Sequence, residues 1–188
     1  CGGGSCIPQA GTTRKLDSLG DRPMYRLAYR NFVSSQSMVF NHSVTYGTSV
    51  GVRWYELKNT GNGFEEYQHG TYAPDSNYRW MGSMAIDKDG NIALGYSTSG
   101  SNLYPGLRAT GRLSTDTINT LQNERVLQAG GGSQTGYSRW GDYSSMRVDP
   151  FDDSTFWYTG EYFKASSSYT WSTYIGSFKL GAQTPPAD

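Results

Sequence analysis

Three residues in the second half of the chain have the types and spacing that could do chemistry. Asp142 and Tyr143 belong to a Gly-Asp-Tyr insertion at 141–143, and Glu161 follows in the segment 159–162. A tyrosine beside carboxylates can act as a nucleophile when a nearby base accepts its proton, so Tyr143 and Glu161 form a candidate couple. The alternative, which the pattern favours, is structural: Asp142 caps a turn and Tyr143 packs between sheets.

Three arginines form a second candidate group. Arg22, Arg79 and Arg139 each follow a similar segment of the chain, so we expect them to occupy equivalent places. Converging guanidinium groups would bind a carboxylate bidentately. However, function generally lies in features added to a repeat rather than in the repeat itself. We therefore predict that the three arginines are structural and that Arg139→Ala lowers stability more than binding.

Aromatic side chains supply the remaining ligand-binding candidates. We expect them at the mouth of a central channel, where they could recognise a glycan or a protein partner. These residues are Tyr46, Trp80, Tyr104, Trp140 and Tyr162.

The elements that must position these residues repeat along the chain. A Gln-x-Gly pattern occurs at 9–11, 68–70 and 128–130. A period of about 60 residues indicates a blade or an array. Segments such as 50–57 and 154–162 are rich in β-branched and aromatic residues, as strands are, and turn residues bound them. The sequence therefore predicts an all-β chain with about four short strands in each copy, which is typical of β-propeller blades.

The repeat also predicts the organisation of the chain. We expect blades at about 7–70, 71–130 and 131–180, between a flexible segment, 1–6, and a tail, 181–188. Their inner strands should lie near 24–30, 81–87 and 143–149. Closed propellers typically have four to eight blades, so three blades predict half of a six-bladed ring. The other blades would come from another chain or a symmetry copy, which would also pair with the strand near 7–11.

Composition excludes several classes of partner. The chain has 16 basic and 16 acidic side chains and no run of like charge, which argues against binding nucleic acid. No apolar run reaches the roughly 18 residues of a membrane helix. Cys1 and Cys6 favour a disulfide, local or with a missing segment, over a lipidated Cys1, and a disulfide indicates an extracellular or cell-surface location.

No cofactor is expected. Two cysteines and two histidines without ligand spacing make a zinc site improbable. Structural calcium could bind hairpin aspartates, although the EF-hand spacing is missing and turn formation explains them. These aspartates are Asp87, Asp89, Asp149, Asp152 and Asp153.

Several segments carry a resemblance to a known family. Segments 21–32, 50–57, 70–97 and 139–159 resemble secreted bacterial proteins with sialidase-like (BNR-type) β-propellers, over most of residues 6–180. The resemblance implies a six-bladed, secreted propeller that is often one module of a larger protein. The sialidase Asp-box, Ser-x-Asp-x-Gly-x-x-Trp, is absent, and 21–24 does not match the arginine motif that opens sialidase domains.

Two functions follow as expectations. The favoured one is a secreted module that recognises a glycan or a protein through its aromatic surface. The alternative is a sialidase-type glycoside hydrolase that uses the Tyr143 and Glu161 couple, since sialidases are the glycosidases with a tyrosine nucleophile. Because the sialidase signatures are missing, we expect no turnover of sialosides.

Overall fold

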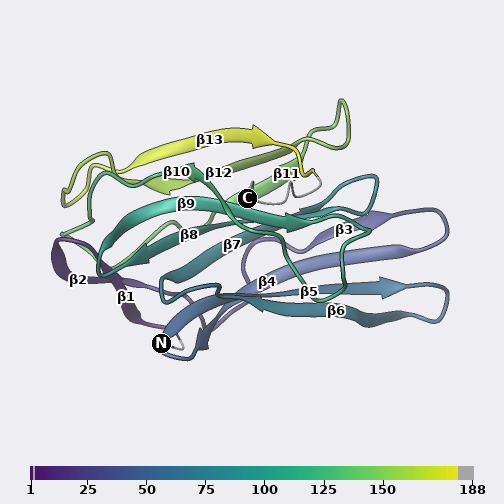
Figure 1. Cartoon of the computed structure of the whole chain (residues 1–188), viewed down its shortest axis with the longest axis horizontal. Coiled ribbons are helices and arrows are strands. Elements are labelled where there is room, and N and C mark those ends of the chain that lie inside the picture. The colour runs from purple at the N-terminus through teal and green to yellow at the C-terminus, as the bar shows by residue number, and fades with distance from the viewer. Residues whose placement is uncertain (2, 182–188) are drawn as a thin grey trace, which may run out of the picture.

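The computed structural model describes residues 1 and 3–181, and strands make up its regular structure. A hairpin of two strands and three larger antiparallel sheets account for the thirteen strands of this part of the chain (Figure 1). The described residues contain no helix, as the sequence predicts. The predicted tail, 181–188, lies outside the described residues except for Gly181.

The sheets follow one another along the chain. The hairpin is β1 (Ser5–Gln9) and β2 (Thr12–Asp17). The first sheet contains β3 (Ala28–Asn31), β4 (Gln36–Tyr46), β5 (Ser49–Asn59) and β6 (Phe64–Tyr72), in that order. The second contains β7 (Tyr78–Ile86), β8 (Ile92–Gly100), β9 (Leu103–Arg112) and β10 (Arg125–Gln128). The third contains β11 (Ser145–Val148), β12 (Phe156–Tyr162) and β13 (Ser172–Phe178).

The second sheet lies between the other two, as Figure 1 shows. Every residue of β8 is buried, so this strand is covered on both faces. Trp54 of the first sheet and Tyr96 of the second belong to one apolar cluster, whereas Leu107 of the second sheet and Phe156 of the third belong to another. Burial of these two apolar layers holds the three sheets together.

Tight turns join the strands where aspartate and glycine predict them. Asp87 Oδ1 accepts hydrogen bonds from the backbone N–H groups of Asp89 and Asn91, both at 2.9 Å, and Gly90 has a φ of +79°. Glycine adopts this left-handed conformation without steric cost. The Asp87 side chain thus accepts hydrogen bonds within its turn. Among the described residues, no group of three or more acidic, histidine or cysteine side chains is placed to hold a metal ion.

The predicted inner strands correspond to the first strand of each sheet. The observed strands are β3, β7 and β11, close to the expected ranges. Arg30, in β3, forms an ion pair with Asp153 in the turn between β11 and β12. The first and third sheets therefore contact each other, and β7 contacts both β3 and β11.

The N-terminal strand has a partner that the sequence analysis did not predict. β1 pairs with β2 of its own chain. Residues 12–17 supply the partner strand, and Gly11, with a φ of +70°, permits the tight turn between them. Gln9 Nε2 also donates to the carbonyl of Gln134 at 3.0 Å, and Gln134 N–H donates back to Gln9 Oε1 at 2.9 Å. These two buried hydrogen bonds connect the hairpin to the segment that precedes β11.

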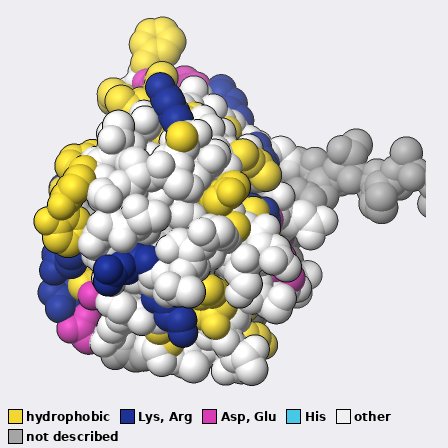
Figure 2. Space-filling model, turned by 90° about the vertical axis from the view of Figure 1, so that its left-hand side faces the viewer, with side chains coloured by type: hydrophobic (Ala, Val, Ile, Leu, Met, Phe, Trp, Pro, Cys, Tyr) yellow, Lys and Arg dark blue, Asp and Glu magenta, His cyan; other side chains and the backbone are white. Residues whose placement is uncertain are grey.

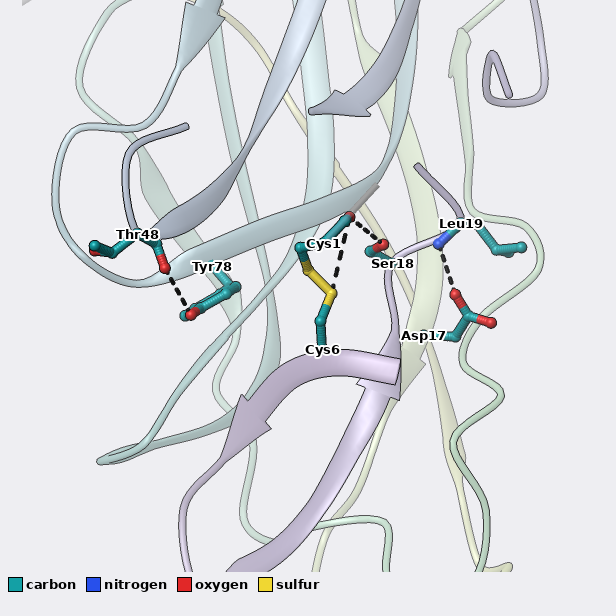
Figure 3. The surroundings of a disulfide bond; sticks show 7 residues. All are labelled: Cys1, Cys6, Asp17, Ser18, Leu19, Thr48 and Tyr78. Carbon is teal, nitrogen blue, oxygen red and sulfur yellow. Dashed lines mark hydrogen bonds between the residues drawn. A yellow bond between two sulfur atoms is a disulfide. The ribbon is translucent and has the colours of Figure 1, made fainter. Parts of the chain in front are cut away.

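A disulfide joins Cys1 and Cys6, which is the local pairing among those expected (Figure 3). Ser18 Oγ donates a hydrogen bond to the carbonyl of Cys1 at 3.1 Å, so the start of the chain is tied to the residue after β2. Cys6 itself lies in β1. The segment predicted to be flexible, 1–6, thus contains a covalent loop and the beginning of a strand. None of the described residues forms a helix long and apolar enough to cross a membrane.

Candidate functional site

An open cleft lies at the end of the third sheet, where β12 connects to β13. Its volume is about 350 Å³. Figure 2 looks onto this end of the molecule, where apolar side chains are scattered among polar ones. The lining residues come from 134–142, from Glu161 and from 168–171; they are Gln134, Tyr137, Arg139, Trp140, Gly141, Asp142, Glu161, Ser168, Tyr169 and Trp171.

Four aromatic side chains form most of the cleft wall. Tyr137, Tyr169 and Trp171 are each more than half exposed. The rings of Tyr137 and Tyr169 meet edge to face with centroids 5.1 Å apart, and their hydroxyls are 3.2 Å apart. Trp140 is buried beneath them, stacked on Phe163, and donates its Nε1–H to Ser97 Oγ at 3.0 Å. The cleft therefore has a rigid aromatic floor and exposed aromatic rims.

Backbone contacts hold the two walls together. Thr135 N–H donates to the carbonyl of Ser167 at 2.9 Å, and Ser167 N–H donates to that of Ser133 at 3.0 Å. A β-carbon added to Gly132 would lie 2.0 Å from the backbone nitrogen of Ser166. Only glycine allows so close an approach of two backbones. The glycine run at 130–132 thus lets the walls form before any ligand binds.

Two carboxylates with different surroundings face the cleft. Asp142 forms an ion pair with Arg139. Glu161 Oε2 accepts a hydrogen bond from Gly141 N–H at 3.0 Å, and no basic side chain pairs with it among the described residues. Burial raises the pKa of Glu161, and the negative charge of Asp142 raises it further, although the Gly141 hydrogen bond opposes this. Glu161 therefore retains its proton to a higher pH than an ordinary glutamate does.

The structure brings together part of the predicted catalytic group. Asp142 and Glu161 line the cleft, but Tyr143 is not among the lining residues. The Tyr143 side chain is 45% exposed. The pKa of Arg22 is raised by hydrogen bonding and charge from Asp21 and, to a smaller extent, by Tyr143. Tyr143 therefore lies beside Arg22, while its neighbour Asp142 lines the cleft with Glu161.

The three arginines do not occupy equivalent places, so that prediction is wrong. Arg79 is fully buried and binds Asp75 and Glu124, whereas Arg22 and Arg139 are exposed on the surface. The difference follows from position, because only the second sheet is covered on both sides. Arg79 is enclosed by its ion pairs, whereas the Arg139 side chain is 70% exposed and lines the cleft. The sequence predicts that Arg139→Ala lowers stability. Given these positions, we expect the larger loss of stability when Arg79 is replaced instead.

The predicted aromatic candidates are dispersed. Trp80 is buried in the core near the hairpin, and its ring centroid lies 6.0 Å from that of Trp140. Tyr46 is exposed at the end of β4, Tyr104 is in β9, and Tyr162 ends β12. None of these four side chains lines the cleft, and Trp140 alone of the aromatic set does.

Sequence reasoning missed the cleft residues of the β12–β13 connection. Tyr169 and Trp171 belong to a Ser- and Tyr-rich stretch without apolar alternation. Two large aromatic residues in such a polar connection are the signal that could have identified them, since loops that expose aromatic residues often bind ligands.

Comparison with known proteins adds no relative to this description. A scan of family models, a search of curated proteins and a search of solved structures each found no match to this chain.

Proposed function

We propose that the chain is a glycan-recognition module that binds sugar rings in the aromatic cleft. The observation that best supports this proposal is that one cleft combines polar groups with the exposed side chains of Tyr137, Tyr169 and Trp171. Sugar rings have apolar C–H faces that pack on aromatic rings, and hydroxyl rims that exchange hydrogen bonds with amide and carboxylate groups. Gln134, Ser168 and Asp142 supply such groups here.

The charges of the cleft favour a neutral or amino sugar over an acidic one. Arg139 is already paired with Asp142, and Glu161 adds a second carboxyl group. Among the described residues, an anionic sugar would therefore meet no unpaired basic side chain in the cleft. Arg22 and Arg79 do not line it, so three arginines do not converge on a carboxylate as they would in a site for sialic acid.

Replacing Trp171 tests the cleft. Trp171→Ala should weaken glycan binding by about five- to thirtyfold, because stacking on one aromatic face contributes on the order of 1–2 kcal/mol. Isothermal titration with a ligand identified on an array of neutral and amino glycans measures the change. Trp157→Ala is the matched control, since Trp157 is also an exposed tryptophan of the third sheet but does not line the cleft. Equal losses in both variants would contradict the assignment.

A second candidate function is glycan hydrolysis at the same cleft. The observation that favours it is the raised pKa of Glu161 beside the ion-paired Asp142. Glycosidases generally use a pair of carboxyl groups, one of which has a raised pKa and acts as the acid. Glu161 would protonate the glycosidic oxygen and Asp142 would accept a proton from water. This pair replaces the Tyr143 and Glu161 couple that the sequence suggests.

We propose further that the three sheets are consecutive blades of a propeller completed by a second copy of the chain, outside the cell. In support, the first strand of the second sheet, β7, contacts the first strands of the other two sheets, and the Cys1–Cys6 disulfide suits an oxidising compartment. The outer face of the first sheet carries the stacked rings of Phe40 and Tyr55 and the exposed Tyr29.

Light scattering tests the assembly. A six-bladed ring should have twice the 20.7 kDa mass of the chain. Tyr55→Glu, on the outer face of the first sheet, should shift the mass to that of one chain because a buried unpaired charge is costly. A wild-type mass of one chain at every concentration would rule out the two-copy ring.

A further inference from the structure

A second cavity lies between the first and second sheets, at the end of the molecule opposite the aromatic cleft. Its volume is about 210 Å³. The turn after β3 and the turn between β7 and β8 contribute to its wall, and Figure 1 places these turns on the right, away from the β12–β13 connection on the left. It is therefore separate from the proposed glycan site.

Arg112 gives this cavity its chemistry. The residue is 2% exposed and lines the cavity. Its Nη2 donates to the carbonyl of Asp116 at 2.6 Å, but its buried Nε has no hydrogen-bond partner, and no carboxylate of the described residues forms an ion pair with it. A buried guanidinium without a counter-charge is costly, so this group needs an anion.

The neighbouring charges leave one positive charge in excess. Lys58 and Lys88 line the cavity with Arg112, and Glu56 and Asp89 are the carboxylates in its wall. Glu56 already has its own partners. It accepts hydrogen bonds from Ser37 Oγ at 2.8 Å and Gln68 Nε2 at 2.5 Å, and Lys58 Nζ lies 3.6 Å from it. Glu56 is therefore not available to neutralise Arg112.

We propose that this cavity binds a small oxyanion, a phosphate, sulfate or carboxylate group, on Arg112. The planar guanidinium presents paired N–H donors that match two oxygens of such a group. Lys58 and Lys88 add positive charge at the rim, and the hydroxyls of Ser35 and Ser114 line the same cavity. The volume suits a single small anion, not an oligosaccharide. Binding here is independent of the glycan cleft.

Titration with inorganic phosphate tests the site, at constant ionic strength maintained with chloride. The intact chain should show saturable binding by calorimetry, together with a rise in Tm. Arg112→Gln should weaken phosphate binding by at least about tenfold, because one charge-assisted contact is lost. Arg14→Gln is the matched control and should bind as the wild type does, since Arg14 is an exposed residue of β2 that does not line the cavity. Parallel titrations with sulfate and acetate distinguish a tetrahedral from a planar anion.

A second variant covers the possibility that Arg112→Gln does not fold. Lys58→Gln leaves Arg112 in place and removes the rim charge, so it should fold and bind phosphate about tenfold more weakly. The proposal is overturned if phosphate fails to saturate and its effect only follows ionic strength. It is equally overturned if every folded variant of Arg112 and Lys58 binds phosphate as the wild type does.

Discussion

Replacing Arg79 by methionine should lower the free energy of unfolding by about 3–5 kcal/mol, as measured by urea denaturation. Arg79 Nε and Nη2 donate to the two oxygens of Glu124 at 2.9 and 2.7 Å, and Nη1 donates to Asp75 Oδ1 at 2.7 Å. Burial alone would raise the pKa of Glu124, but hydrogen bonds from Arg79 and Tyr96 outweigh burial and lower it. Without Arg79, this buried carboxylate keeps Arg108 as its ion-pair partner but loses two of its hydrogen bonds.

The repeat itself supplies the control for this experiment. Arg139→Met removes an exposed arginine from the corresponding position of the next copy, and its surface ion pair should contribute no more than about 1 kcal/mol. The double variant Arg79→Met with Glu124→Gln should recover part of the loss, because a neutral amide that has lost two hydrogen bonds costs less to bury than a carboxylate that has lost them. If the two single arginine variants unfold at the same urea concentration, the ion pairs of Arg79 are not what stabilises the second sheet.

Glu161→Gln should lower any glycan hydrolysis by about 10² to 10⁴-fold, the usual contribution of a general acid. Glutamine keeps the size of the side chain and can still accept the Gly141 hydrogen bond, but it has no proton to give to a leaving oxygen. Since the pKa of Glu161 is raised, its protonated form persists above the ordinary range of a glutamate. Hydrolysis should therefore be retained in weak acid and should fall as the pH rises through this raised pKa.

Chromatography of released sugars measures the effect, with a glycan that the cleft binds as substrate. Glu65→Gln is the control, because Glu65 is exposed on β6 and does not line the cleft. Sialosides should remain uncut, as Tyr143 and the three arginines are not assembled in one site. A bound glycan that stays intact at every pH would show that the cleft recognises sugars without cleaving them, and the first proposed function would then stand alone.

The local architecture was predictable from short stretches of sequence. Alternating β-branched and aromatic residues predict strands, and β5 and β12 are found where they do. The aspartate and glycine of 87–90 predict the hairpin between β7 and β8, because their side-chain hydrogen bonds and positive φ act within a few residues. Cys1 and Cys6 are likewise close enough in the chain for their pairing to be expected.

The candidate site was only half predictable. Asp142 stands out because the insertion at 141–143 breaks the repeat, and Glu161 is the candidate base for Tyr143. Tyr169 and Trp171 do not stand out, since their position opposite Tyr137 depends on how 131–136 runs along 163–168. The glycines at 130–132 permit this close approach, but the sequence does not indicate which segment of backbone they contact.

What the sequence determined by itself is the all-β character, the succession of three strand groups and the residues of the turns, because these depend on contacts between near neighbours. Only the tertiary structure decided how far Arg22, Arg79 and Arg139 are buried, since their local sequences are similar. Stacking covers the second sheet on both faces, so Arg79 is buried and needs two carboxylates, while the other two remain at the surface. Burial depends on neighbours brought together from distant parts of the chain, and a repeated motif does not specify them.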